Sequence, residues 1–312
     1  MVRVSVRFSA IGILFVTWLL SGCLEDDPVG LETPVQTPVG MAEWYRLYFT
    51  QPDDPASRSL RGGPDADLAK AIEQARLGVD VAAYDLDLWS LRDALIAAHR
   101  RGVAVRVVAE SDNLDAPEFQ QLKEAGITML GDRREGLMHN KFVIIDRQQV
   151  WTGSMNFTIN GAYRNNNNLL GIHSSQLAQN YTAEFEEMFT DDRFGPGSPA
   201  NTPNTLLWAE DTLLETYFSP DDGVATRLLD LVRSAEGSVH FMAYSFTSDD
   251  LAQVLIERAD AGLEVRGILE ESQARSNIGG EYENLRQSGV DVRLGGQSGN
   301  MHHKVLIIDG RI

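Results

Sequence analysis

The apolar positions along the chain follow two patterns in turn, one typical of strands and the other typical of helices. Short apolar runs rich in β-branched residues are typical of buried strands, and apolar residues three and four apart are typical of helices that cover a sheet. The expected strands are residues 79–84, 103–108 and 142–145. The expected helices are residues 91–101 and 117–125, each followed by a glycine stop. This strand–helix order predicts an α/β domain.

The same pattern then occurs a second time. The segment "VDVAAYDLD" from Val79 corresponds to "VHFMAYSFT" from Val239, 160 residues later. The nonapeptide "MHNKFVIID" from Met138 corresponds to "MHHKVLIID" from Met301, 163 residues later. Arg106 and Glu110 of "VAVRVVAE" correspond in the same way to the arginine and final glutamate of "LEVRGILE". A repeat of this length predicts two tandem copies of one domain.

The repeat and the composition of the segments between its copies give a domain plan. We expect a first domain over 42–195, a Pro/Gly-rich linker over 196–210 and a second domain over 211–312. The second copy ends three residues after Asp309, before any counterpart of the segment that follows Asp146. We therefore expect the second domain to be truncated at its C-terminus, as in a fragment of a longer reading frame.

The first 23 residues have the pattern of a targeting segment. Arg3 and Arg7 precede the apolar run "AIGILFVTWLL", which is too short to span a bilayer comfortably. The sequence "LSGC" then resembles the bacterial lipoprotein box, which implies lipidation of Cys23 and an exported protein anchored at the outer membrane or cell envelope. An ordinary cleaved signal peptide or a short membrane anchor is the alternative. Residues 24–41 are expected to form an acidic tether.

Charge and cysteine content narrow the choice of partners. The net charge of −18 opposes polyanions at long range, although it does not exclude a locally positive cleft. Cys23 is the only cysteine, so no intramolecular disulfide can form.

The repeated nonapeptide carries the candidate chemistry. Residues two apart in a strand share a face, so His139 and Lys141 project together, as do His302 and Lys304. After the first copy the chain returns with "VWTGSMNFT", which brings Ser154 and Asn156 back beside the first pair. An ammonium and neutral donors can hold the oxygens of a phosphodiester, and imidazole can attack phosphorus or move a proton. Two histidines are needed because a nucleophile and an acid require opposite protonation states.

These residues resemble the motif His-x-Lys-x4-Asp followed by Gly-Ser-x-Asn of the phospholipase D superfamily. The first motif is His139, Lys141, Asp146, Gly153, Ser154 and Asn156. The second is His302, Lys304 and Asp309. The resemblance implies two tandem phospholipase D-like α/β/α sandwich domains related by a pseudo-two-fold axis, in a monomer that acts as an intramolecular pseudo-dimer.

The resemblance also implies a two-step reaction without metal or cofactor. By analogy with other members of the superfamily, His139 is assigned as the nucleophile that forms a phosphohistidine, and His302 as the general acid and base. The sequence does not fix which histidine has which role. Lys141, Lys304, Ser154 and Asn156 would hold the phosphate. Asp146 and Asp309 are interpreted as structural, because strand parity carries them away from the His–Lys face.

Two further positions concern the histidines. Many members of the superfamily have a carboxylate that orients the motif histidine, and the corresponding residue here is Asn167. An amide cannot stabilise an imidazolium as an anion does, so we expect His139 to be a weaker base than usual. His303 is interpreted as a variable neighbour of His302, and the chain offers no cluster of ligands for a metal.

The function expected from these observations is hydrolysis of a phospholipid head group at a membrane surface. A nucleic-acid phosphodiesterase is the first alternative, favoured only by a basic groove that could stack bases. A phosphatidyl transferase resembling cardiolipin synthase differs only in the acceptor. An inactive surface lipoprotein is the remaining alternative, motivated by Asn167 and by the expected truncation.

Overall fold

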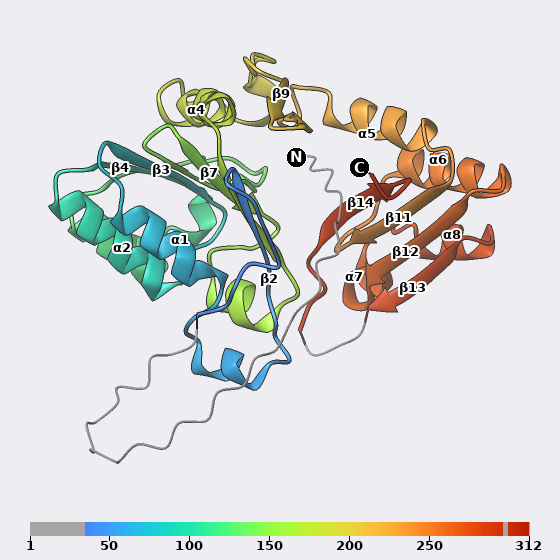
Figure 1. The fold of residues 1–312 in the computed structure, drawn as a ribbon, viewed down its shortest axis with the longest axis horizontal. Helices are drawn as coiled ribbons and strands as arrows, with labels where there is room; N and C mark the ends of the chain where they lie inside the picture. The colour runs from blue at the N-terminus through green and yellow to red at the C-terminus, as the bar shows by residue number, and fades with distance from the viewer. Residues whose placement is uncertain (1–34, 296–298, 312) are drawn as a thin grey trace, which may run out of the picture.

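The computed structural model describes residues 35–295 and 299–311 (Figure 1). The expected signal peptide, the lipidation residue Cys23 and the tether up to residue 34 lie outside the described residues. Within the described ranges, no helix has both the length and the apolar character that crossing a membrane requires.

An eight-stranded sheet organises the first half, in the order β1-β2-β8-β7-β6-β3-β4-β5. Strands β3, β4 and β5 are parallel, and β6 pairs antiparallel with β3. The strands are β1 Gly40–Met41, β2 Tyr45–Phe49, β3 Gly78–Ala83, β4 Ala104–Ala109, β5 Thr128–Gly131, β6 Lys141–Ile145, β7 Gln149–Gly153 and β8 Asn168–His173. The expected strands in this half are confirmed within one or two residues.

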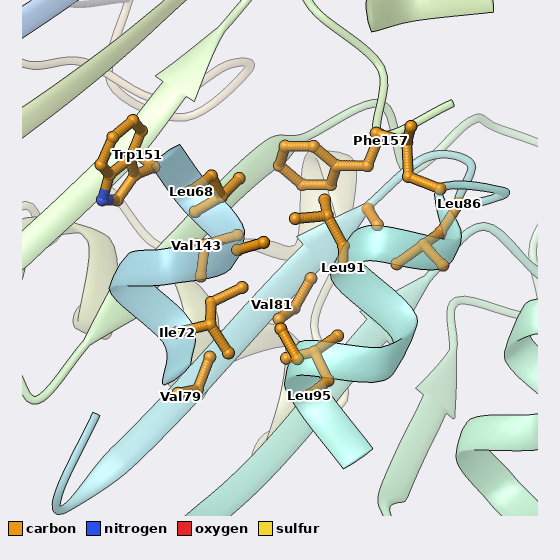
Figure 2. Close-up of a cluster of buried hydrophobic side chains, with 14 of the residues drawn as sticks. Leu68, Ile72, Val79, Val81, Leu86, Leu91, Leu95, Val143, Trp151 and Phe157 are labelled. Carbon is orange, nitrogen blue, oxygen red and sulfur yellow. The ribbon is translucent and has the colours of Figure 1, made fainter. Parts of the chain in front are cut away.

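Helices cover both faces of this sheet, so the first half has three layers (Figure 1). On one face, Val79 and Val81 of β3 belong to an apolar cluster with buried residues of α1 (Pro64–Glu73) and α2 (Trp89–Arg100) (Figure 2). On the other face, Phe142 of β6 packs against Tyr181 of α4 (Ser175–Phe189). The remaining helical segments are η1 Pro55–Ser59, η2 Ser111–Asn113, α3 Pro117–Glu124, η3 Asn160–Arg164 and η4 Gly195–Gly197.

The second half repeats the central part of the first sheet. Its four strands have the order β13-β12-β11-β14, with the same parallel and antiparallel pairings. Lys141 pairs with Ala83 in the first sheet, and Lys304 pairs with Ala243 in the second. The strands are β11 Ser238–Ala243, β12 Glu264–Glu270, β13 Asp291–Gly295 and β14 Lys304–Ile308. The structure confirms the expected mixed α/β fold with two copies.

The two halves differ in how their sheets are covered. Helices α5, α6 and α8 pack on one face of the second sheet, where Val239 and Phe241 lie buried. On the opposite face Ile268 and Ile307 are each 40% exposed. The second half is thus a two-layer structure within the described residues. Its helices are α5 Val224–Arg233, α6 Asp249–Asp260, α7 Glu271–Ser276 and α8 Tyr282–Gln287.

A short hairpin, β9 (Leu206–Ala209) with β10 (Thr212–Glu215), connects the two halves. Leu207 and Leu214 of this hairpin are buried in the apolar cluster beneath α4. The end of the predicted linker therefore packs against the first half.

Asp146 and Asp309 each tie a strand end to a neighbouring loop. The Asp146 carboxylate accepts hydrogen bonds from the backbone N–H groups of residues 76–78 at 2.7–3.1 Å. The Asp309 carboxylate accepts from the N–H groups of residues 236–238 at 2.7–3.3 Å. Both residues have a left-handed backbone, with φ of 53° and 52°, which aspartate tolerates better than most residues.

We expect Asp146→Ala to lower the free energy of unfolding by about 2–3 kcal/mol, because three backbone donors lose a charged acceptor. Asp146→Asn keeps one acceptor oxygen and should cost less. Urea unfolding of both variants tests this, with Asp115→Ala at an exposed position as the control. An Asp146→Ala variant as stable as the control would contradict the structural role.

Candidate active site

The first His–Lys pair lies at the start of β6 and is supported by one aromatic ring. The ring centres of His139 and Tyr84 are 4.8 Å apart, with an edge contact. The Lys141 ammonium lies 5.1 Å from the centre of the same tyrosine ring and donates a hydrogen bond to the backbone carbonyl of His139 at 2.7 Å. A cation–π contact and a hydrogen bond thus fix the direction of the ammonium.

The second pair repeats this arrangement at the start of β14. His302 and Tyr244 have ring centres 4.6 Å apart. The Lys304 ammonium lies 5.2 Å from the Tyr244 ring centre and donates to the His302 carbonyl at 2.9 Å. The two tyrosines are in register in the sequence repeat, and that register was the only sign of their role.

A buried glutamate holds the backbone before each histidine. The N–H of Met138 donates to Glu110 Oε2 at 2.7 Å, and the N–H of Met301 donates to Glu270 Oε2 at 2.7 Å. Both carboxylates are nearly inaccessible to water, because the two glutamates are only 2% and 6% exposed. The sequence repeat includes these glutamates, but the pattern does not indicate that they anchor the histidine segments.

The two halves meet at a seam formed by the asparagine run 165–168 and residues 300–303. The Asn166 N–H donates to the Asn300 carbonyl at 2.8 Å, and the His302 N–H donates to the Asn166 carbonyl at 2.9 Å. The Asn165 side chain accepts from the Asn300 N–H at 3.1 Å. Three hydrogen bonds from backbone N–H groups therefore set the register of the second histidine against the first half.

The side chains of the last two asparagines of the run contact the adjacent histidines His302 and His303. Asn168 Nδ2 lies 3.1 Å from His303 Nδ1, and Asn167 Oδ1 lies 2.9 Å from His302 Nδ1. Phe49 adds an edge contact to the His303 ring, with ring centres 5.6 Å apart. The interpretation of His303 as a variable neighbour stays a prediction, and in this chain its ring forms part of the seam.

The hydrogen bonds around Asn167 fix the tautomer of His302. Asn167 Nδ2 donates to the Gly161 carbonyl at 2.9 Å, which orients Oδ1 toward His302. His302 Nδ1 faces only acceptors, Asn167 Oδ1 at 2.9 Å and the Ser154 carbonyl at 3.0 Å. Nδ1 must therefore carry the proton, and Nε2 keeps its lone pair.

The expectation that Asn167 acts on His139 was wrong. Asn167 lies on the seam, completely buried, and contacts the histidine of the other half. The His139 residue is exposed, and its ring has no hydrogen-bond partner within residues 35–295 and 299–311.

The Gly-Ser-x-Asn residues have different surroundings. Ser154 Oγ donates to Asn167 Oδ1 at 2.9 Å and accepts from the Asn168 N–H at 3.0 Å, so its proton is used within the seam. Gly153 has a φ of 156°, and a Cβ there would collide with the Asn168 carbonyl oxygen. Asn156 Oδ1 is buried without a hydrogen-bond partner in the part of the chain that the structure describes.

A cavity of about 720 Å³ opens beside the two pairs. His139, Lys141, Ser154 and Lys304 line it. His302, Asn156 and Asn167 are not among its lining residues. The structure therefore brings both lysines and one histidine to the cavity wall. His302 is 7% exposed and lies close enough to Lys141 and His139 for their charges to lower its pKa.

The surroundings of both lysines disfavour their charged forms. Burial, followed by the positive charge of Lys304, lowers the pKa of Lys141 to about 7, and nearby Asp85 partly offsets this. Although Lys304 as a whole residue is exposed, desolvation of its ammonium lowers its pKa to about 7. An anion placed between the two lysines would favour their charged forms.

Both imidazoles are neutral near pH 7. Although His139 as a whole residue is exposed, desolvation of its ring lowers its pKa to about 4, and the positive charges of Lys141 and Lys304 add to this. Desolvation also lowers the pKa of His302, to about 3, and here the positive charge of Lys304 has a larger effect than that of Lys141. The pKa of each histidine is thus lowered by the lysine of the other half, as expected for groups that share one site. No three His, Cys, Asp or Glu residues among those described are grouped to hold a metal ion.

Comparison with known proteins gives the class. A family model described as "Cardiolipin synthase, PLD-like domain" matches residues 68–189 and 228–312, more than half of the chain. The chain therefore belongs to this PLD-like family, within the phospholipase D superfamily of phosphodiesterases.

Curated relatives agree with this class, and a solved structure has a similar fold. The chain is 33% identical over 119 residues to a mitochondrial cardiolipin hydrolase of Xenopus laevis, covering 38% of this chain and 57% of that protein. It is 35% identical over 116 residues to a phospholipase D of Rickettsia prowazekii, covering 36% of this chain and 57% of that protein. The matches thus span little more than half of each relative. The fold is also similar to that of phosphatidylserine synthase from Haemophilus influenzae Rd KW20, with a TM-score of 0.57 at 15% identity, covering 78% of this chain and 73% of that one.

We expect Asn167→Asp to raise the pKa of His302, because a carboxylate beside Nδ1 stabilises the imidazolium where the amide does not. The shift should be at least about one unit for a buried opposite charge at hydrogen-bond distance. NMR titration of the histidine ring nitrogens, in the wild type and in Asn167→Asp, measures it. An unchanged His302 titration would contradict the hydrogen bond across the seam.

Proposed function

We propose that this protein is a metal-independent phosphodiesterase of the phospholipase D type that removes the head group of a phospholipid. The main support is the pair of lysines, one from each half, whose pKa values are lowered to about 7 beside one cavity that both of them line. The names of the two curated relatives, a cardiolipin hydrolase and a phospholipase D, favour a lipid as the substrate.

In the first step, His302 Nε2 attacks phosphorus while the bond from phosphorus to the head-group oxygen breaks. The support for His302 is its tautomer, since Asn167 and the Ser154 carbonyl hold the proton on Nδ1 and leave Nε2 free. This order is the reverse of the one assigned from family habit. The product is a phosphatidyl group on His302.

His139 is the partner acid. Its ring lies at the cavity wall, and its protonated form donates a proton to the departing alkoxide. A bound phosphodiester raises the pKa of His139 toward the value that this role needs. In the second step, neutral His139 takes a proton from water, the resulting hydroxide attacks phosphorus, and the bond to His302 breaks.

Transfer to an alcohol differs from hydrolysis only in this second step. The family description includes cardiolipin synthase, so an alcohol such as glycerol is a second candidate acceptor in place of water. We further propose that Cys23 carries a lipid anchor that holds the enzyme at the surface of its substrate.

Hydrolysis of phosphatidylcholine vesicles by the full chain, with EDTA present, tests the proposal. Single-stranded DNA is the parallel substrate. We expect head-group release, reduced at least about 10³-fold in both His139→Ala and His302→Ala. DNA cleavage lost in both variants, without lipid hydrolysis, would assign the chain to nucleases instead. Turnover that survives either substitution would contradict the two-histidine mechanism.

The lysines predict the pH dependence of substrate binding. A phosphodiester is anionic throughout, whereas the lysines of the free enzyme lose their protons as pH rises through about 7. The KM for a lipid without an ammonium group, such as phosphatidylglycerol, should therefore be constant below pH 6 and rise above pH 7, by about tenfold per unit for each lysine that must be charged. Steady-state kinetics from pH 5 to 9 measures this dependence. Lys123 does not line the cavity, so Lys123→Met is a control that should leave the dependence unchanged. A KM that falls with rising pH would contradict the role of the lysines.

A further inference from the structure

The cavity beside the His–Lys pairs has a second, acidic region. Glu184 of α4 lines the same cavity as Lys141 and Lys304. It is only 7% exposed, yet it lies at a wall of a space large enough for a head group. The phosphodiester mechanism gives this carboxylate no task.

A hydrogen bond places Glu184 close to the motif. Asn140 lies between His139 and Lys141 in the chain, and its Nδ2 donates to Glu184 Oε1 at 3.0 Å. Asn140 and Glu184 are both among the residues that line the cavity. The carboxylate is thus one side chain away from the segment that carries the catalytic pair.

The charge of Glu184 is not balanced by the protein. Burial raises its pKa to about 8, the Asn140 bond opposes this, and the negative charges of Glu187, Asp221 and Asp222 add to the rise. None of the groups that shift its pKa is a cation. Glu187 is itself 4% exposed, and its Oε2 has no hydrogen-bond partner within the described ranges. A positive charge delivered by a ligand would stabilise this region.

The chemistry of the wall favours an organic cation over a metal ion. The described residues contain no group of three metal-ligating side chains. Aromatic rings line the cavity near Glu184, and Tyr181 meets Phe218 edge to face with ring centres 5.0 Å apart. A carboxylate beside aromatic rings is a favourable environment for an ammonium group.

We propose that Glu184 determines the head-group specificity of this enzyme, by favouring phosphodiesters whose leaving alcohol carries an ammonium group. The inference rests on the proposed phospholipid hydrolysis. The two lysines hold the phosphate, and the carboxylate on the wall of the same cavity holds the amine. Head groups without a positive charge, such as glycerol, gain nothing from Glu184.

Head-group preference in the wild type and in Glu184→Gln tests the inference. The substrates are vesicles of phosphatidylcholine, phosphatidylethanolamine or phosphatidylglycerol with the same acyl chains, and the enzyme is the full chain. We expect kcat/KM to be about tenfold higher for the two ammonium lipids than for phosphatidylglycerol, and this ratio to fall to about one in Glu184→Gln, mainly through KM. Glu186→Gln on the same helix, where the side chain contacts Arg106 instead, is the matched control.

A pH series on the wild type tests the same inference without any substitution, so it holds even if Glu184→Gln does not fold. Phosphatidylcholine has a permanent cation, so its head group does not titrate. Glu184 titrates beside Glu187, Asp221 and Asp222, whose negative charges add to the rise in its pKa. The two histidines act on the phosphate of both lipids alike. The lysines affect both lipids equally. The ratio of kcat/KM for phosphatidylcholine to that for phosphatidylglycerol should therefore rise from about one toward about ten between pH 7 and 9, as Glu184 loses its proton with a pKa of about 8, and level off above.

The outcomes separate the inference from the proposed function. Hydrolysis of all lipids with no preference for the ammonium lipids, or with a preference that neither pH nor Glu184→Gln changes, would overturn the role of Glu184 and leave phospholipid hydrolysis standing. Failure to hydrolyse any of the lipids would overturn both.

Discussion

A hydrogen bond between the two halves of the chain, from His302 Nδ1 to Asn167 Oδ1 at 2.9 Å, determines how the site can react. It fixes the proton on the inner nitrogen of the ring and leaves the outer nitrogen as a nucleophile. The bond is well defined because Asn167 is fully buried and its own amide is oriented by the Gly161 carbonyl. Burying a polar side chain costs free energy unless each of its hydrogen-bond partners is in place. The residues of the seam can therefore move little relative to one another.

In the proposed mechanism the site needs both copies, and the seam joins them. Each half builds the same local support, a tyrosine under the histidine and lysine and a glutamate behind them. What one half lacks is a second lysine charge and a second imidazole. Joined at residues 165–168, the halves place the ammonium of Lys304 close enough to lower the proton affinity of Lys141, and a phosphodiester between the two lysines offsets that repulsion.

The sequence predicted the repeat and the order of strands and helices, because local spacing encodes both. It also placed the two His–Lys pairs at the starts of corresponding strands, where the structure has them. Strand ends were correct within one or two residues, as for β3 and β6. Tyr84 and Glu110 were visible as residues repeated in register, although nothing local shows which groups they contact.

Contacts across the seam could not be predicted in the same way. Asn167 was assigned to the nearer histidine, because its actual partner lies 135 residues away in the sequence. Glu184 is a similar case. A glutamate in an amphipathic helix usually faces water, and only the packing of α4 on the sheet shows that this one lines a cavity.

The central claim is that His302 is the nucleophile and His139 the acid and base. A phosphodiester with a p-nitrophenol leaving group tests it directly, because this alcohol departs without a proton donor. His139→Ala should release about one equivalent of p-nitrophenol in a burst and then stop, with the phosphoryl group on the peptide that contains His302, whereas His302→Ala should show no burst. A burst in His302→Ala, with the phosphoryl group on His139, would contradict the account.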